Sequence, residues 1–195
     1  LIQQIKILHE LNQQMSKDAN NLTSALKGQS KTQGNWGEFI LESILEKSGL
    51  VKNREYVVQE SITAESGRRF QPDVIINLPE NKSIIIDSKV SLIGYERFVS
   101  SDDEQEKQLA LREHINSIRS HIKNLSGKNY QNLYQLESLD FVLMFMPIEP
   151  AFALAVQSDN AIFTDAFDKN IVIVSPSTLL ATLRTIASIW RQESQ

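Results

Sequence analysis

The chain has 195 residues, of which 41% are hydrophobic, and its formal net charge is −4 at pH 7; this size and apolar content predict one globular domain with a helical extension. The absence of cysteine excludes disulfides, thiolate nucleophiles, iron–sulfur clusters and thiolate zinc sites, and it favours a reducing, cytoplasmic setting. The acidic balance provides no general attraction to nucleic acid, so binding to phosphate requires a local basic surface or a metal ion.

Residues 1–30 predict a helical arm. Stepping by four and three positions selects a heptad seam, and Asn12 on it resembles the polar core residue that fixes register in parallel coiled coils. The seam residues are Leu1, Ile5, Leu8, Asn12, Met15, Ala19, Leu22 and Leu26. One interpretation is the end of a coiled coil that makes the protein a homo-oligomer, and the other is an amphipathic helix lying on its own domain. Glycines and polar residues place the boundary near residue 30, so we expect an arm at 1–30 and a second domain at 31–195.

The sequence does not predict a membrane-spanning segment. No apolar run approaches the roughly 20 residues that span a bilayer. The sequence begins with Leu1 rather than Met, so we expect a fragment of a longer chain, and an upstream anchor or targeting signal is left open.

The second domain alternates helical and strand patterns. We expect a helix capped by Asn35 and stopped at Gly49, and then three strands at residues 56–63, 70–78 and 83–90. The last two strands form a hairpin through the turn-forming residues 79–82.

The rest of the domain continues the alternation. A charged stretch at 102–107 opens a long helix that ends at Gly127, and residues 141–146 and 171–174 are apolar strands covered on both faces. Ser175 and Pro176 then start a final helix. The order α-β-β-β-α-β-α-β-α predicts an α/β domain in which helices flank a mixed central sheet.

Two carboxylates flank the hydrophobic runs of the predicted hairpin. Asp73 precedes one strand and Asp87 ends the next, so a turn centred on Asn81 brings them together at one end of the sheet. Buried like charges repel each other, and a hard cation such as Mg²⁺ or Mn²⁺ removes this problem because it prefers oxygen ligands. Lys89 lies two positions after Asp87, hence on the same face, where it can reach a metal-bound water or a phosphate oxygen. This arrangement matches metal-assisted attack of water on a phosphodiester. The alternative is a solvated ion pair with Asp73 as a turn former.

Several motifs carry a resemblance to known proteins. Pro72 and Asp73, followed by Asp87, Ser88 and Lys89, resemble the PD-(D/E)xK pattern of restriction-endonuclease-like nucleases. More narrowly, the chain resembles the RmuC family of DNA recombination proteins. That likeness rests on GNWGE at 34–38, RFQPDV at 69–74, IDSKVSL at 86–92, FMPIE at 145–149, SPSTLL at 175–180 and LRTI at 183–186.

The resemblance implies a restriction-endonuclease-like core and roles for the matching residues. Asp73 and Asp87 would be metal ligands, the Ser88 carbonyl a third, and Lys89 would orient the attacking water. Nucleases of this fold often add an acid from the first helix, and Glu38 fits that position. The alternative for Glu38 is a helix-surface acid favoured by the helix dipole. Family membership implies the fold rather than cleavage itself.

Five basic residues are candidates for contact with DNA phosphates: Arg68, Arg69, Arg119, Lys123 and Arg184. The first two precede the metal-site strand, the next two share a stripe on the long helix, and the last lies off the apolar stripe of the final helix. A solvated strand edge and solvated helix faces are the alternatives.

Glu149 and the histidine pair give less specific indications of a site. Glu149, at the end of a buried strand, either approaches the site or caps a helix. His114 and His121 are seven positions apart rather than the four of a helical zinc pair, which argues against zinc.

The leading hypothesis is therefore a DNA recombination protein that hydrolyses phosphodiester bonds with Mg²⁺ or Mn²⁺. A second is a DNA-structure-binding protein that keeps the nuclease fold without cutting, and a third is a coiled-coil assembly module with a structural acidic cluster.

Overall fold

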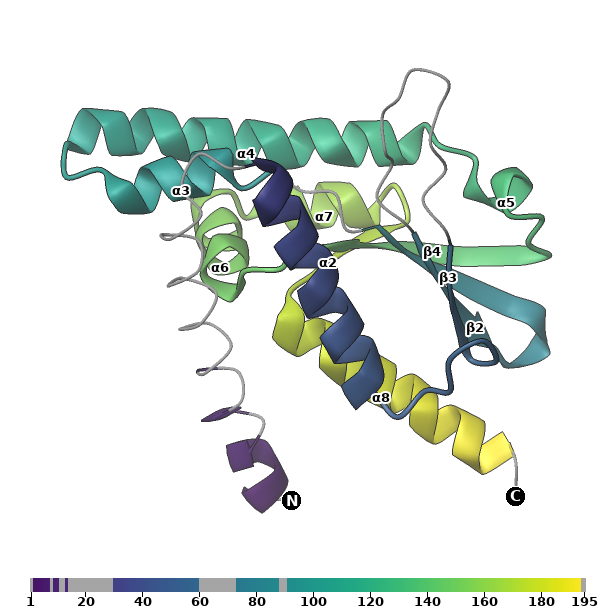
Figure 1. Ribbon diagram of the computed structural model, residues 1–195. Coiled ribbons are helices and arrows are strands. Elements are labelled where there is room, and N and C mark those ends of the chain that lie inside the picture. Colours follow the sequence, from purple (N-terminus) through teal and green to yellow (C-terminus); the bar gives the residue numbers. More distant parts are fainter. Residues whose placement is uncertain are drawn as a thin grey trace.

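A five-stranded mixed sheet lies at the centre of the computed structural model, which describes residues 2–7, 9–10, 13, 30–59, 73–87 and 91–193 (Figure 1). The strands lie side by side in the order in which they occur along the chain. They are β1 (Tyr56–Val58), β2 (Val74–Leu78), β3 (Lys82–Asp87), β4 (Ser138–Phe145) and β5 (Ile171–Val174). The first three strands are antiparallel neighbours, whereas β3, β4 and β5 run parallel. The predicted α/β class with a mixed sheet is confirmed.

The hairpin of β2 and β3 closes tightly. A single 3₁₀ turn, η1 (Pro79–Asn81), joins the strands, and the backbone φ angles of Glu80 and Asn81 are 65° and 59°. This left-handed region is uncommon for residues other than glycine. Leu78 pairs with Lys82 and Val74 pairs with Ile86, so the turn is centred on Glu80 and not on Asn81.

Helices supply the crossover connections that parallel strands require. Between β3 and β4 the chain forms α3 (Ile93–Ser100), α4 (Glu104–Ser126) and α5 (Tyr130–Leu133); between β4 and β5 it forms α6 (Glu149–Ser158) and α7 (Ala161–Phe167). The Asp103 carboxylate accepts a 3.2 Å hydrogen bond from the Gln105 N–H and so caps α4, and Gly127 ends this helix. The predicted long helix is therefore confirmed.

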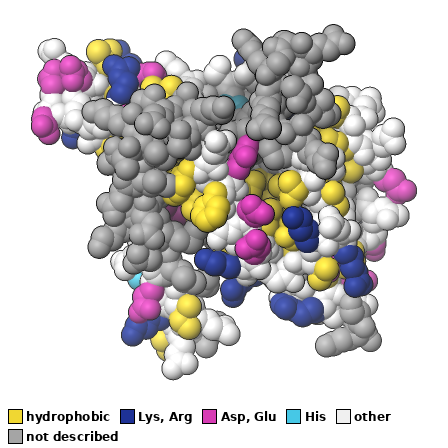
Figure 2. Space-filling view, in the orientation of Figure 1, with side chains coloured by type: hydrophobic (Ala, Val, Ile, Leu, Met, Phe, Trp, Pro, Cys, Tyr) yellow, Lys and Arg dark blue, Asp and Glu magenta, His cyan; other side chains and the backbone are white. Residues whose placement is uncertain are grey.

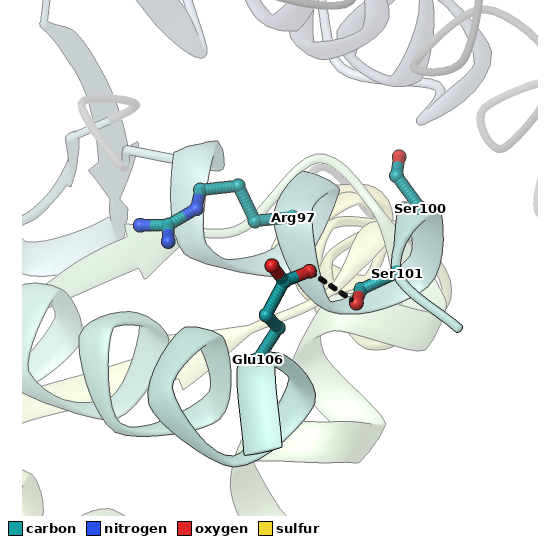
Figure 3. Close-up of a pocket in the computed structure, with 4 residues that line it drawn as sticks. All are labelled: Arg97, Ser100, Ser101 and Glu106. Atoms are coloured by element: carbon teal, nitrogen blue, oxygen red, sulfur yellow. Dashed lines mark hydrogen bonds between the residues drawn. The ribbon is translucent and has the colours of Figure 1, made fainter. Parts of the chain in front are cut away.

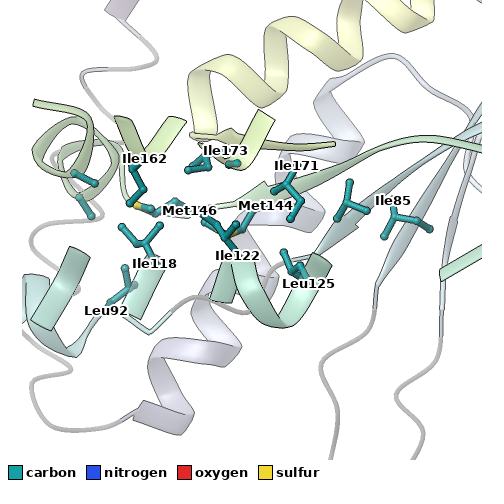
Figure 4. Packing of buried hydrophobic residues seen from close by; sticks show 14 of the residues in the cluster. Ile85, Leu92, Ile118, Ile122, Leu125, Met144, Met146, Ile162, Ile171 and Ile173 are labelled. Carbon is teal, nitrogen blue, oxygen red and sulfur yellow. The ribbon is translucent and has the colours of Figure 1, made fainter. Parts of the chain in front are cut away.

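Alternation along the strands divides the apolar side chains between two cores, because successive residues of a strand point to opposite faces. On one face Ile75 and Ile85 pack under α3, α4, α6 and α7. On the other face Ile76 and Ile86 pack under α2 (Ser30–Lys47) and α8 (Pro176–Glu193). Figure 4 shows helix and strand side chains meeting in the first core, among them Ile118, Ile122, Leu125, Met144, Ile171 and Ile173.

Some boundaries differ from those predicted. The helix α2 begins at Ser30 rather than Asn35, so Gly34 lies within it, and β4 begins at Ser138 rather than at residue 141. The helix α3 was not predicted, and two helices rather than one precede β5. The predicted strands 56–63, 70–78 and 83–90 are observed as the shorter β1, β2 and β3, with Gln59 and Asp73 just outside them. The predicted strand positions 60–63, 70–72 and 88–90 lie outside the described residues.

The predicted arm is described only in part. Residues 2–7 are helical, and the side chains of Ile2 and Ile5 are exposed. The other seam positions lie outside the described residues, so the coiled coil and the homo-oligomer stay predictions. Within the described part of the chain, no helix is both long enough and apolar enough to cross a membrane.

Candidate metal and nucleic-acid site

Asp73 and Asp87 stand opposite each other at one end of the β2–β3 hairpin. The last pair in the register is Val74 with Ile86, and each aspartate is one position beyond it. The Asp73 carbonyl also accepts a 2.9 Å hydrogen bond from the Gln59 N–H, which fixes its backbone beside β1. Residues directly opposite in an antiparallel pair point to the same face of the sheet. The predicted convergence of the two carboxylates is thus confirmed.

Both carboxylates are buried and accept hydrogen bonds from the helical layer. Asp87 is 0% exposed and Asp73 is 7% exposed. The Tyr130 hydroxyl donates to Asp87 Oδ2 over 2.9 Å, and the Tyr134 hydroxyl donates to Asp73 Oδ2 over 2.6 Å. His121 Nε2 lies 3.2 Å from Asp87 Oδ1. A buried carboxylate without such donors is strongly disfavoured, so α4 and α5 complete the site.

The two tyrosines respond to both aspartates. Burial, followed by the negative charges of Asp87 and Asp73, raises the pKa of Tyr130 well above its ordinary value of 10.0. Burial and the hydrogen bond to Asp73 also raise the pKa of Tyr134, and the charge of Asp87 adds to the effect. Because each phenol senses both carboxylates, all four groups form one electrostatic cluster, in which the phenols stay protonated as donors.

The chemistry of this cluster suits a hard divalent cation. Paired carboxylate oxygens are the ligands that Mg²⁺ and Mn²⁺ prefer, and the position lies at the carboxyl end of the parallel strands β3, β4 and β5, where open α/β sheets bind ligands. Within the residues that the structure describes, no three His, Cys, Asp or Glu side chains form a group able to hold a metal ion. The metal would therefore take ligands from Asp73 and Asp87 and complete its shell with water or substrate oxygens.

The other predicted site residues are placed as follows. Ser88, Lys89, Arg68 and Arg69 lie outside the described residues. Glu38 is half-buried on α2, whose Leu41 and Ile44 pack in the core on the opposite face, whereas Trp36 packs against the core on the side of the two aspartates. The structure brings Asp73 and Asp87 to one end of the hairpin, and the role of Glu38 as a third acid stays a prediction.

The basic candidates differ in what surrounds them. The Arg119 guanidinium is engaged by two carboxylates, at 2.7 Å from Asp159 and 2.9 Å from Asp165. These hydrogen bonds raise the pKa of Arg119 and tie α4 to α6 and α7. Lys123 and Arg184 are exposed on α4 and α8. Figure 2 shows one face of the molecule, where Lys and Arg side chains are scattered among acidic and hydrophobic ones.

Three side chains that contact the two aspartates were not predicted as site residues. His121 lies on the same stripe of α4 as the buried Ile118 and Leu125. This shared stripe indicates in the sequence that His121 faces the sheet. Tyr130 and Tyr134 are one helical turn apart, but the short α5 has no apolar periodicity that would reveal their direction.

Glu149 caps a helix rather than joining the acidic pair. Its Oε2 accepts a 3.2 Å hydrogen bond from the Ser177 N–H, and its Oε1 accepts bonds from the Ser175 and Ser177 hydroxyls at 2.9 Å and 2.7 Å. These groups form the first turn of α8, where a negative charge is favourable. The capping alternative for Glu149 is therefore the correct one, although the helix is α8 and not the one that Glu149 begins.

A shallow hollow lies elsewhere, between α3 and the start of α4 (Figure 3). It is lined by Arg97, Ser100, Ser101 and Glu106, and the Ser101 hydroxyl donates a 2.9 Å hydrogen bond to Glu106 Oε2. None of the predicted site residues lines it.

Comparisons with known proteins agree with one another. The sequence profile of the RmuC family matches residues 1–195. A "DNA recombination protein RmuC homolog" from Pseudomonas aeruginosa is 55% identical over 195 residues, which cover all of this chain and 43% of that protein. A protein of the same name from Vibrio cholerae and "DNA recombination protein RmuC" from Escherichia coli K12 are each 50% identical over the whole chain, which covers 38% and 41% of them. The chain thus spans about two fifths of the length of these relatives, and no solved structure matches it.

Proposed function

The chain belongs to the RmuC family, and from that premise we propose that it is the nuclease domain of a DNA recombination protein, which hydrolyses phosphodiester bonds with Mg²⁺ or Mn²⁺. The proposal includes a restriction-endonuclease-like fold. Support for that fold comes from the order of an antiparallel hairpin followed by parallel strands, with Asp73 and Asp87 at the end of the hairpin.

One observation carries the proposal: two buried carboxylates lie together at one end of the interior strands β2 and β3. A chain gains no stability from like charges placed so close together, since each disfavours ionisation of the other. Functional sites are where such costs are retained. The relatives named for DNA recombination support DNA as the substrate class.

The residues would divide the chemistry among them. Asp73 and Asp87 hold the divalent ion, which when bound supplies Lewis-acid activation of water and of the phosphate. Lys89, two positions beyond Asp87, orients the attacking water and offsets negative charge on the phosphate, and the Ser88 carbonyl is a further ligand. Glu38 would supply an additional acid from α2, the helix whose Trp36 packs against the core on the same side of the sheet as the two aspartates.

Exposed cations would position the DNA backbone. Lys123 and Arg184 are exposed on α4 and α8, and Arg68 and Arg69 precede β2 in the sequence. Arg119 contributes less, because two carboxylates already neutralise its charge. Phosphate contacts of this kind give affinity that falls steeply with salt.

A second candidate is a protein that binds DNA structures without cutting them. It is favoured by the donors that already surround the carboxylates: Tyr130 and His121 on Asp87, and Tyr134 on Asp73. Such donors compensate buried charge without a metal, so the acidic pair is compatible with a structural role.

Cleavage of branched and linear DNA tests the two candidates directly. We expect the wild-type protein to cut with Mg²⁺ or Mn²⁺, Asp87→Ala and Lys89→Ala to lose at least a hundredfold in rate, and the exposed-site control Asp168→Ala to keep full activity. Equal residual cleavage by all four proteins would mean contamination and would reject the enzyme. Metal-independent binding of branched DNA, with no cleavage by the wild type, would establish the second candidate instead.

A further inference from the structure

We infer that Tyr130 and Tyr134 are positioning residues of the proposed metal site, whose hydroxyls hold Asp73 and Asp87 in the orientation that binds a divalent cation. This inference rests on the proposed function, because it assigns a role to residues that surround the proposed ligands. Neither tyrosine belongs to the sequence motifs that indicated the site.

Each tyrosine donates to a different aspartate, and His121 Nε2 lies 3.2 Å from the other oxygen of Asp87. The Tyr130 hydroxyl contacts Asp87 Oδ2 at 2.9 Å, and the Tyr134 hydroxyl contacts Asp73 Oδ2 at 2.6 Å. A hydrogen bond to one oxygen of a carboxylate fixes the rotation of the whole group, and so it also fixes where the lone pairs of both oxygens point. Groups that orient metal ligands in this way strongly affect metal affinity.

The two hydroxyls are held in register by the helical turn that carries them. The Tyr134 N–H donates a 3.0 Å hydrogen bond to the Tyr130 carbonyl, so residues 130 and 134 lie on the same side of α5 and its cap. The rings stack with their centroids 6.3 Å apart and their planes inclined by 24°. The Asn129 side chain caps the turn by accepting a 3.2 Å hydrogen bond from the Asn132 N–H.

Packing makes this arrangement rigid. Tyr130 is 1% exposed within the core that also contains Ile122 and Leu125, and Tyr134 packs against the same core. The Lys128 ammonium lies 5.1 Å from the centre of the Tyr130 ring and covers its outer side. A site whose supporting groups are locked by packing keeps its ligands in place before the metal arrives.

A purely structural role is the competing explanation. In that case the hydroxyls only compensate buried charge, and removing them lowers the stability of the protein without changing its metal affinity. If the hydroxyls position the carboxylates, removing them lowers the metal affinity, because that affinity depends on how the carboxylates are oriented.

Binding of Mn²⁺ to the 195-residue chain without DNA separates these explanations. We expect Tyr134→Phe and Tyr130→Phe to weaken Mn²⁺ binding roughly 10- to 100-fold in calorimetric titrations, the range typical of groups that orient metal ligands. Tyr56→Phe removes a hydroxyl from β1 in the other core and should bind Mn²⁺ like the wild type. Thermal unfolding followed by circular dichroism confirms that each variant is folded. If Tyr130→Phe does not fold, Mn²⁺ binding by Tyr134→Phe, at a half-buried position, provides the test.

The outcomes distinguish this inference from the function on which it rests. Loss of Mn²⁺ binding in Asp87→Ala, together with wild-type affinity in both tyrosine variants, would overturn the positioning role alone. Wild-type protein that binds no Mn²⁺, or that binds it as Asp87→Ala does, would overturn both proposals.

Discussion

Asp73 and Asp87 face each other one position beyond the last paired residues of the β2–β3 hairpin. The strand register alone fixes this relationship, because an antiparallel pair places opposite side chains on one face. The acidic pair therefore comes from one hairpin, whereas its hydrogen-bond donors come from helical segments far away in the sequence. Each part of this arrangement leads to a measurable expectation.

Replacing Asp87 with Asn should separate stability from metal response. In EDTA we expect Asp87→Asn to unfold at the same temperature as the wild type or higher, because one of two repelling charges is gone. Saturating Mg²⁺ should stabilise the wild type by about 2–3 kcal/mol at a hundredfold excess over Kd and should leave the variant unchanged. Differential scanning calorimetry measures both effects, and Asp140→Asn in β4 is the control. A variant that Mg²⁺ stabilises as much as the wild type would show that Asp87 is not a ligand.

Gly94 in α3 should not accept even a methyl group. A Cβ at this position would lie 2.5 Å from the His114 nitrogen and 2.9 Å from its Cα, both of them backbone atoms of α4. Relief requires the two helices to move apart, so we expect Gly94→Ala to lower the free energy of unfolding by about 1–3 kcal/mol. Urea denaturation tests this, with Gly127→Ala as the control, since its new Cβ would meet nothing closer than 3.7 Å. Equal midpoints for the two variants would contradict the packing of α3 on α4.

Glu149 should stabilise the start of α8. Glu149→Ala removes the acceptor of the Ser177 N–H and of two serine hydroxyls, and we expect a loss of about 1–2 kcal/mol, typical of a helix cap with a favourable charge. Glu193→Ala, at the exposed C-terminal end of the same helix, should have no destabilising effect. Chemical denaturation of the two variants gives the comparison, and similar losses in both would argue against the cap.

Arg119 should matter more for stability than for DNA binding. Its side chain is 39% exposed, so solvent screens the two ion pairs, and we expect Arg119→Ala to cost only about 1 kcal/mol, and less at high salt. Fluorescence anisotropy with labelled branched DNA should show a smaller loss of affinity for Arg119→Ala than for Lys123→Ala. The opposite order would show that DNA displaces Asp159 and Asp165 from the guanidinium.

His114 should make stability fall as the pH falls below about 6.5. Burial lowers the pKa of His114 in the folded protein, outweighing the hydrogen bond to the Ala151 carbonyl, and its Nδ1 is buried without a partner in the described part of the chain. Below the ordinary value of 6.5 the unfolded chain therefore binds a proton that the folded chain does not, which favours unfolding by up to about 1.4 kcal/mol per pH unit. Between pH 7.5 and 5.5 the wild type should lose more stability in urea titrations than His114→Gln does. Parallel pH profiles would contradict the lowered pKa.

Local signals made part of this structure predictable. The charged stretch at 102–107, the terminator Gly127 and the Ser175–Pro176 start are local signals, so the approximate bounds of α4 and the start of α8 could be predicted from the sequence. The hairpin and its acidic pair were equally local, since 14 positions (87 − 73) separate the two aspartates. The eight-residue α3 escaped prediction because its contact with α4 depends on the missing side chain of Gly94.

The remainder of the site depends on tertiary structure. Tyr130 is 43 residues from Asp87, and Tyr134 is 61 residues from Asp73, so no periodicity within a window of the sequence reports either contact. His121 was visible as a member of the buried stripe of α4, yet only the crossing of α4 over the sheet selects Asp87 as its partner.

The order of the strands in the sheet has a consequence for synthesis on the ribosome. Because β1 to β5 are neighbours in the order of translation, each strand can add to an edge that has already emerged. The hairpin closes over a short loop, so its formation does not depend on α5, which is made later. A hairpin formed at that stage lacks the tyrosine hydroxyls that donate to Asp73 and Asp87 in the complete fold.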